Sequence, residues 1–233
     1  MTVTSGHGRR PTEGDVVERA RAVIFDLDGV LTDTADFHYL AWQALADDEG
    51  LPFDRAANEH LRGVSRRDSL LLILGDRQVD EAAFEEMMER KNQLYLASLE
   101  HMGPEDALPG ARELVSEARR RGLLVAIGSS SKNARFVLDK LGLADAFDAV
   151  ADGSSVERAK PAPDLFVRAA EMLGVEPSAC IVVEDAASGV DAALAAGMKA
   201  VGVGPQDRVG HAHHRFDTTA DIDLDAVLAD GSR

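Results

Sequence analysis

Short apolar runs that stop at polar residues recur along the chain. They cover residues 22–25, 123–128, 147–150, 180–183 and 200–203, of which the run at 147–150 is the weakest. Continuous apolar runs of this length are typical of strands that are buried on both faces. The pattern therefore predicts five strands within one sheet.

Segments with helical spacing alternate with the later runs. They cover residues 111–122, 132–143, 162–175 and 187–197, and each ends at or beside a glycine. Glycine near the last periodic residue is a common helix stop. The alternation predicts an α/β fold, with a Rossmann-like parallel sheet and helices on both of its faces. Ligands of such sheets bind beyond the carboxyl ends of the strands.

The stretch between residues 33 and 107 breaks this alternation, because it contains no run typical of a buried strand. Residues 36–50, 58–75 and 80–100 all have the spacing of helices. We interpret residues 33–107 as a helical cap domain that is inserted into the α/β domain. The linkers at its two ends should then lie side by side.

The insertion divides the α/β catalytic core into two pieces, residues 21–32 and residues 108–233. Residues 1–20 are polar and contain glycine and proline. We interpret them as a flexible N-terminal extension outside the core. They carry an arginine pair at 9–10 without a following apolar stretch, so they do not resemble a secretory signal.

Charge and cysteine content limit the possible partners. The 233 residues include 25 Lys and Arg against 41 Asp and Glu, which gives a formal net charge of −16. An acidic protein repels nucleic-acid phosphates, so we expect no nucleic-acid partner. The single cysteine, Cys180, cannot form an internal disulfide, which is typical of the reducing cytoplasm. No apolar run approaches the ~20 residues of a membrane span, and we expect no membrane partner.

The sharpest chemical signal lies at the end of the first predicted strand, where Asp26 and Asp28 stand two residues apart and Gly29 follows. Side chains two apart on a strand point to the same side, so the two carboxylates come close together. Like charges at close range repel unless a proton or a cation stabilises them. A hard divalent cation with oxygen ligands, such as Mg²⁺, is the natural partner.

Further polar groups stand at other strand ends or before helices. Glu184 and Asp185 follow a second apolar run and could share a cation with the first pair. Ser129 begins a hydroxyl-rich turn before a helix, which is typical of an anion site. Lys160 precedes a stiff, proline-containing loop that could direct its charge toward the acidic cluster. We interpret the histidines at 211–214 as part of a solvated loop away from that cluster.

In order and position, these segments resemble the haloacid dehalogenase superfamily of phosphotransferases. The resemblance implies that Asp26 is a nucleophile that forms an aspartyl-phosphate. It implies that Asp28 is the general acid and base. Ser129 and Lys160 would bind the transferring phosphoryl group. The metal would be Mg²⁺, held by Asp26, the main-chain carbonyl of Asp28, Glu184 and Asp185.

From residue 22 to about residue 204, the chain is similar to one branch of this superfamily, the β-phosphoglucomutases. The motifs that carry the resemblance are FDLDGVLTDTADFHYLAWQAL, LRGVSRRDSL, ERKN, SSSKN, KPAPD and VVEDAASGV. The first motif contains Thr34, His38 and Trp42, which this family uses to couple cap closure to the general acid. Thr34 would lie at the hinge, and His38 would hydrogen-bond toward Asp28 in the closed state.

The other motifs supply the sugar-phosphate contacts that the resemblance implies. Arg66 would clamp the phosphate that is not being transferred, because a guanidinium fork matches phosphate oxygens. The family often has Lys at the position of Arg62, so this contact departs from the common pattern. The remaining implied contacts are Trp42, Gly63, Val64, Ser65, Ser69, Lys91, Ser130, Ser131, Lys132 and Asn133.

The resemblance implies an enzyme that interconverts β-glucose 1-phosphate and glucose 6-phosphate. Glucose 1,6-bisphosphate would be the intermediate and the activating phosphoryl donor, and we expect a monomer that acts on small sugar phosphates. A Mg²⁺-dependent hexose-phosphate phosphatase of the same fold is the nearest alternative. A catalytically silent sugar-phosphate sensor is disfavoured, because a sensor need not keep the nucleophile Asp26.

Overall fold

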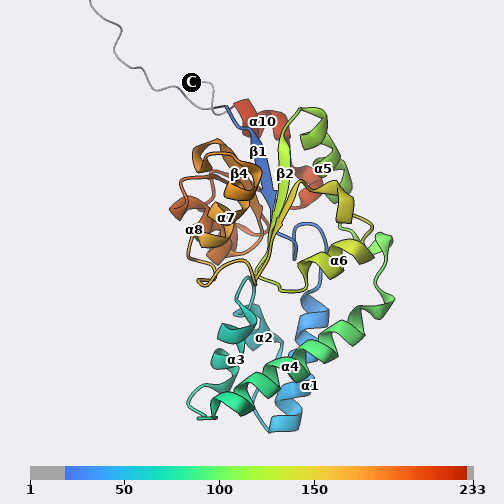
Figure 1. Cartoon of the computed structure of the whole chain (residues 1–233), viewed down its shortest axis with the longest axis vertical. Coiled ribbons are helices and arrows are strands. Elements are labelled where there is room, and N and C mark those ends of the chain that lie inside the picture. Colours follow the sequence, from blue (N-terminus) through green and yellow to red (C-terminus); the bar gives the residue numbers. More distant parts are fainter. Residues whose placement is uncertain (1–18, 230–233) are drawn as a thin grey trace, which may run out of the picture.

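A six-stranded parallel sheet lies at the centre of the structure, a computed structural model that describes residues 19–229 (Figure 1). The strand order is β3-β2-β1-β4-β5-β6, and all neighbouring strands pair in parallel. The strands are β1 (Ala22–Phe25), β2 (Leu124–Gly128), β3 (Ala149–Ala151), β4 (Cys180–Glu184), β5 (Lys199–Val203) and β6 (His214–Phe216). The predicted α/β fold class is confirmed. Most of the predicted N-terminal extension, residues 1–18, lies outside the described residues.

Helices cover both faces of the sheet, and the short helix α9 (Gln206–Val209) follows β5. One face carries α5 (Ala111–Arg120), α6 (Ala134–Lys140) and α10 (Leu224–Ala229), and the other carries α7 (Asp164–Leu173) and α8 (Ala187–Ala195). In β1, Val23 and Phe25 pack with the first group of helices, and Ala22 and Ile24 pack with the second. A strand that is buried on both faces must be apolar at every position, which explains the continuous apolar runs.

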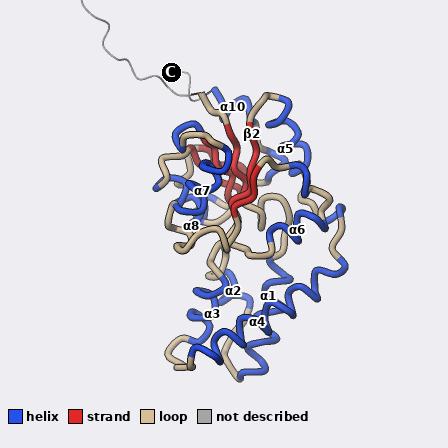
Figure 2. Tube along the Cα trace, viewed as in Figure 1, coloured by secondary structure: helices blue, strands red, loops and turns tan. Residues whose placement is uncertain are grey.

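Between β1 and α5 the chain forms helices, and Figure 2 shows no strand in this part of the described chain. The helices are α1 (Ala35–Glu49), α2 (Arg55–Glu59), α3 (Arg66–Leu74) and α4 (Glu81–Ser98), followed by 3₁₀ turns at Leu99–His101 and Pro104–Asp106. They enclose a separate apolar core that includes Trp42, Leu45, Leu70 and Phe84. We refer to residues 33–107 as the helical segment. Within residues 19–229, no helix has both the length and the hydropathy needed to cross a membrane.

The two ends of the helical segment lie side by side, as the sequence predicts. Thr32 and Ala107 form an isolated antiparallel bridge. The Thr32 hydroxyl donates to the main-chain oxygen of Asp106 at 2.8 Å. The amide of Leu108 donates to the main-chain oxygen of Leu31, also at 2.8 Å. A paired double linker therefore joins the helical segment to the sheet.

One predicted helix is wrong. Residues 58–75 form no continuous helix, because a turn separates α2 from α3. Gly63 lies in this turn with a φ of +73°, a left-handed conformation that interrupts an α-helix. Ser65 then acts as the N-cap of α3, where its hydroxyl accepts the amide of Asp68 at 3.2 Å.

A second difference lies near the end of the described chain. His214 begins the edge strand β6, whereas the sequence predicts a solvated loop at residues 211–214. The strand has the sequence HRF and is only half-buried, so it carries no apolar run that could reveal it. The ring of His213 accepts the amide of Ala200 at 3.0 Å through Nδ1, which gives this histidine a structural role.

We expect Gly63→Ala to destabilise the protein more than Gly50→Ala does. Both glycines have left-handed φ angles, +73° and +64°, so alanine costs about 1 kcal/mol at either position. A Cβ at Gly63 would lie 2.8 Å from the Ser188 hydroxyl and 2.9 Å from the Ala186 Cβ, whereas a Cβ at Gly50 would meet open space. Urea unfolding of both variants measures the difference. Equal losses would contradict a close contact between the Gly63 turn and the sheet domain.

Candidate active site

Two neighbouring strands bring acidic residues together at their carboxyl ends. β1 and β4 pair in register, with Phe25 opposite Val183. The next residues, Asp26 and Glu184, are therefore neighbours, and the amide of Asp26 donates to the main-chain oxygen of Val183 at 2.9 Å. Asp185 follows in the turn before α8. The parallel sheet thus gathers at one edge three carboxylates that come from distant parts of the sequence.

Lys160 is the buried cation of this acidic cluster. Its ammonium nitrogen lies 2.6 Å from Asp26 Oδ1 and 2.5 Å from Glu184 Oε1. Burial alone would lower the pKa of Lys160, but the charges of Asp26 and Glu184 raise it above its ordinary value. The ammonium group therefore stays charged. Lys160 points toward the acidic cluster, as the sequence predicts.

The acidic cluster offers ligands that suit a hard divalent cation. Asp26, Glu184 and Asp185 each present a carboxylate oxygen, and these oxygens lie within 4.8 Å of one another. All three residues are buried, and Glu184 Oε2 accepts the amide of Ala186 at 2.7 Å. Converging carboxylate oxygens fit Mg²⁺, which binds through one or two carboxylates and completes its shell with water or substrate oxygens.

Burial changes the protonation of this cluster. It raises the pKa of Asp26 well above its ordinary value, although the neighbouring Lys160 opposes the shift. Burial and then the charge of Glu184 raise the pKa of Asp185 to about 7, while two nearby arginines oppose the shift. The cluster holds more carboxylates than its one lysine neutralises, and the guanidinium groups of Arg62 and Arg208 supply further positive charge beside Asp185.

Asp28 lies beyond Asp26 and is held by Thr34, whose hydroxyl donates to Asp28 Oδ1. Burial raises the pKa of Asp28, and this hydrogen bond opposes the shift because it favours the carboxylate. Thr34 is the N-cap residue of α1, so the bond ties Asp28 to the start of the helical segment. The predicted hydrogen bond from His38 to Asp28 is not among the contacts of the described residues, because each side chain has another partner.

His38 contacts Lys91, a buried lysine on α4. Nδ1 of His38 lies 2.7 Å from the Lys91 ammonium nitrogen, and the His38 ring stacks on Tyr95 with 4.1 Å between centroids. The ammonium group also lies 4.8 Å from the ring centre of Trp42 and 4.7 Å from that of Tyr95. Burial lowers the pKa of both Lys91 and His38 well below their ordinary values, and the charge of Arg66 lowers each further. Both side chains therefore bind a proton less tightly than they would in water.

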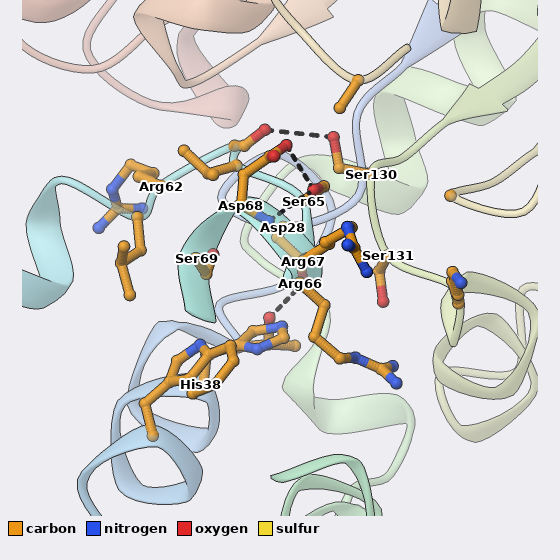
Figure 3. Close-up of a pocket in the computed structure, with 18 of the residues that line it drawn as sticks. Asp28, His38, Arg62, Ser65, Arg66, Arg67, Asp68, Ser69, Ser130 and Ser131 are labelled. Carbon is orange, nitrogen blue, oxygen red and sulfur yellow. Dashed lines mark hydrogen bonds between the residues drawn. The ribbon is translucent and has the colours of Figure 1, made fainter. Parts of the chain in front are cut away.

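The turn between α2 and α3 contacts the sheet domain directly. Arg62 donates to Asp185 Oδ2 at 2.9 Å. The Ser130 hydroxyl, labelled in Figure 3, donates to the main-chain oxygen of Gly63 at 3.2 Å. The left-handed conformation of Gly63 and its missing side chain permit this approach. The helical segment therefore meets the sheet at the strand ends that carry the acidic cluster.

Asn92 joins the same two parts of the molecule at a second point. Its Oδ1 accepts Asn133 Nδ2 at 2.9 Å and an Arg66 guanidinium nitrogen at 2.8 Å. Sequence reasoning missed Asn92 as a site residue, although it follows Lys91 in the ERKN motif. Its role depends on two partners that are distant in the sequence, so only that neighbouring lysine could have drawn attention to it.

The helical segment and the strand ends enclose a cavity of about 630 Å³, part of which is drawn in Figure 3. This volume is in the usual range for small-molecule sites. Most of the predicted site residues line it, namely Asp26, Asp28, Thr34, His38, Trp42, Arg62, Gly63, Val64, Ser65, Arg66, Ser69, Lys91, Ser130, Ser131, Lys132 and Asp185.

Four predicted site residues lie outside this lining. Lys160 and Glu184 are buried within the ion-paired cluster. Ser129 is also buried, and its hydroxyl accepts the amide of Ser131 at 3.1 Å. The Asn133 side chain is engaged with α4 through the hydrogen bond described above. Lys160, Glu184 and Ser129 therefore lie behind the cavity wall. Asn133 lies at the contact between the helical segment and the sheet domain.

The order of these elements and side chains matches a known family. Residues 20–197 match the haloacid dehalogenase-like hydrolases. The chain belongs to this family. The match extends from β1 through α8, the elements that supply the acidic cluster and the helical segment. The predicted superfamily is confirmed.

Individual relatives within the haloacid dehalogenase family include mutases and phosphatases. The β-phosphoglucomutase of Bacillus subtilis (strain 168) is 42% identical over 211 residues, which cover 89% of this chain and 93% of that protein. The fructose-1-phosphate phosphatase YqaB of Escherichia coli (strain K12) is 38% identical over 189 residues, which cover 80% of this chain and 97% of that protein. A crystal structure of β-phosphoglucomutase from Clostridium difficile has 37% identity and a TM-score of 0.88, and the superposition covers 91% of this chain and 97% of that one. This haloacid dehalogenase family member is therefore an enzyme that acts on phosphate groups.

We expect Lys160→Met to lower the free energy of unfolding by about 3 kcal/mol or more in the presence of a chelator, because it leaves buried carboxylates without their cation. Loss of Lys160 also removes the charge that opposes the burial-raised pKa of Asp26, so that pKa rises further. The folded state then binds this proton more tightly than the unfolded state does, and stability increases as the pH falls. The loss should therefore be largest at pH above the folded pKa and smaller at mildly acidic pH.

Urea unfolding at mildly acidic and mildly alkaline pH measures this dependence. Lys140→Met is the control, because the Lys140 ammonium group contacts only the main-chain oxygen of Glu100, at 3.3 Å, among its described hydrogen bonds. We expect a small loss at both pH values for the control. A loss for Lys160→Met that does not change with pH would contradict the pairing of Lys160 with a titrating carboxylate.

Proposed function

We propose that this haloacid dehalogenase family enzyme is a β-phosphoglucomutase, which interconverts β-glucose 1-phosphate and glucose 6-phosphate through glucose 1,6-bisphosphate. The observation that carries the proposal is the enclosed cavity, which is lined both by the carboxylates Asp26 and Asp28 and by the guanidinium of Arg66. A mutase must hold a sugar with a phosphate at each end, so it needs a cationic group beyond the reacting centre. The relatives named β-phosphoglucomutase support the same assignment.

In the first half-reaction, Asp26 is the nucleophile. One of its carboxylate oxygens attacks one phosphorus of the bound glucose 1,6-bisphosphate, and the bond from that phosphorus to the sugar oxygen breaks, which leaves an aspartyl-phosphate and a glucose monophosphate. The departing sugar oxygen takes a proton from Asp28, whose raised pKa favours the protonated acid. Lys160 lies 2.6 Å from Asp26 Oδ1, so it orients the nucleophile and offsets the incoming negative charge.

In the second half-reaction, a sugar hydroxyl attacks the phosphorus that Asp26 carries. Asp28 is now a carboxylate and takes the hydroxyl proton, while the bond from phosphorus to the Asp26 oxygen breaks. The hydroxyl of Thr34 donates to Asp28 and so stabilises the carboxylate form that this step requires. The product of this step is the bisphosphate, which exchanges its ends before Asp26 attacks its other phosphate, and Arg66 holds whichever phosphate is distant from Asp26.

The cluster of Asp26, Glu184 and Asp185 would hold Mg²⁺, with the main-chain carbonyl of Asp28 as a further ligand. When bound, Mg²⁺ supplies positive charge that offsets the negative charge of the transferring phosphoryl group. The buried ion pair of Lys160 with Glu184, at 2.5 Å, fixes one wall of this site independently of the ion.

We infer that the helical segment, residues 33–107, is a cap domain over a core formed by residues 21–32 and 108–233. Its separate apolar core and its paired double linker support movement as one unit. The contacts that close it over the sheet are polar side-chain hydrogen bonds, such as that of Arg62, which can be exchanged for water when it opens. Closure would keep water away from the aspartyl-phosphate while the sugar hydroxyl attacks.

A hexose-phosphate phosphatase is the second candidate, and one observation favours it. The relative named fructose-1-phosphate phosphatase is 38% identical, and the matched region covers 97% of that protein. In this alternative, water attacks the phosphorus on Asp26 in place of the sugar hydroxyl, and Asp28 takes its proton. The two functions share the nucleophile and differ only in whether water or a sugar hydroxyl reaches the aspartyl-phosphate under the closed cap.

The deciding test supplies β-glucose 1-phosphate, Mg²⁺ and a trace of glucose 1,6-bisphosphate, and follows glucose 6-phosphate and free phosphate together. We expect glucose 6-phosphate to exceed free phosphate by far, and Asp26→Asn to abolish both products because it removes the nucleophile. Free phosphate as the main product would identify the phosphatase instead. Activity that survives in Asp26→Asn would overturn the shared mechanism.

We expect Arg66→Ala to lower glucose 6-phosphate formation at least about tenfold, because hydrogen bonds to a charged group contribute about 1.5–3 kcal/mol. Hydrolysis of p-nitrophenyl phosphate, which has no distal phosphate, should change far less. Arg77→Ala is the matched control, since the Arg77 guanidinium pairs with Glu49 at 3.0 Å and Arg77 does not line the cavity. We expect it to leave the ratio of the two rates unchanged. Equal losses of both activities in Arg66→Ala would rule out the clamp.

A further inference from the structure

A second arginine, Arg208, reaches the acidic cluster from the sheet domain. Its Nε–H donates to the main-chain oxygen of Asp185 at 2.7 Å. A terminal nitrogen of the same guanidinium lies 3.8 Å from Asp185 Oδ2. Arg208 belongs to α9, which follows β5, the strand next to β4. The mechanism above makes no use of this residue.

The local backbone makes room for this guanidinium. Gly204, between β5 and α9, has a φ of +124°, which favours glycine. A Cβ at Gly204 would lie 2.5 Å from a terminal nitrogen of Arg208, so a larger residue there would displace the side chain. The missing side chain at residue 204 thus leaves the space that the Arg208 guanidinium fills.

The acceptor of Arg208 belongs to a peptide group that is held from both sides. The carbonyl oxygen of Asp185 accepts Arg208, and the amide of the next residue, Ala186, donates to Glu184 Oε2 at 2.7 Å. The orientation of this one peptide plane therefore sets the direction of the Glu184 carboxylate and of the Asp185 side chain. Arg62 differs from Arg208 in this respect, because it comes from the helical segment and its hydrogen bond to Asp185 goes to the carboxylate and not to the main-chain oxygen.

We propose that Arg208 is a positioning residue for the cation site: by holding the peptide between Asp185 and Ala186, it aims the Glu184 and Asp185 carboxylates at the metal. The inference rests on the metal site of the proposed function. Partners that orient metal ligands typically change metal affinity by about 10-fold to 100-fold when they are removed. The hydrogen bond can act while the metal is bound, because it uses the carbonyl oxygen and leaves the carboxylate oxygens free.

The direction in which metal affinity changes when Arg208 is replaced distinguishes this positioning role from a simple effect of charge. A guanidinium near a divalent cation repels it, so removal of the charge alone should tighten metal binding. Removal of a hydrogen bond that aims the ligands should weaken it. Arg208→Ala removes both the charge and the bond, whereas Arg208→Lys keeps the charge and loses the Nε–H donor.

The experiment titrates the full-length protein with Mn²⁺ alone and measures its Kd calorimetrically. We expect the Kd to rise about tenfold in Arg208→Ala, and by a similar factor in Arg208→Lys. Arg215→Ala is the matched control, because the Arg215 Nε–H also donates to a main-chain oxygen, that of Gly204 at 2.7 Å. The two arginine side chains are equally accessible, at 30% and 29% exposure. We expect the control to bind Mn²⁺ as the wild type does.

Unfolding in the presence of a chelator shows whether each variant is folded before Mn²⁺ is added. An unchanged or lower Kd in Arg208→Ala would overturn the proposal, and so would a wild-type Kd in Arg208→Lys. An equal loss in Arg215→Ala would also overturn it, because the effect would then be a general loosening of this region. If the wild type itself binds no Mn²⁺, the metal site of the proposed function fails, and this inference fails with it. If only the Arg208 variants depart from expectation, the proposed function stands.

Discussion

The ion pair of Lys160 with Asp26 and Glu184 is the interaction on which the rest of the site depends. Its distances, 2.6 Å and 2.5 Å, place a full positive charge in the interior between the ends of two neighbouring strands. Buried charges are costly unless they are paired and hydrogen-bonded. The pairing makes it possible to bury the Asp26 carboxylate beside two others, and Asp26 is the nucleophile of the proposed phosphoryl transfer.

The same crowding of negative charge explains why cationic groups converge on this edge of the sheet from several elements. Arg62 comes from the helical segment and Arg208 from the turn after β5, and both contact Asp185. The whole protein is acidic, so this local collection of cations creates the attraction for phosphate that the overall charge of −16 opposes. The cations beside the cavity therefore attract phosphate locally, although the protein as a whole carries a net negative charge.

The helical segment supplies side chains of the candidate site and also forms the contacts that enclose the cavity. Asn92 binds both Arg66 and Asn133, so the group proposed to hold the distal phosphate also touches the contact between the two parts. The Gly63 turn meets the sheet at the same edge. In the proposed function the mutase and phosphatase alternatives share the nucleophile Asp26, and the tightness of this enclosure would decide whether water or a sugar hydroxyl reaches the aspartyl-phosphate.

The sequence by itself determined five of the six strands, the helical character of residues 33–107 and the positions of Asp26, Glu184 and Asp185 at strand ends, because these follow from local periodicity and from the rule that parallel strands end at one edge. Only the tertiary structure decided which side chains became partners. The break at Gly63, the pairing of His38 with Lys91 and the bond of Arg208 to Asp185 had no such signal, nor did the bridging role of Asn92. Each depends on a contact between residues far apart in the chain, and such contacts produce no periodic pattern of apolar and polar residues in the sequence. They are set by the packing of whole elements against one another.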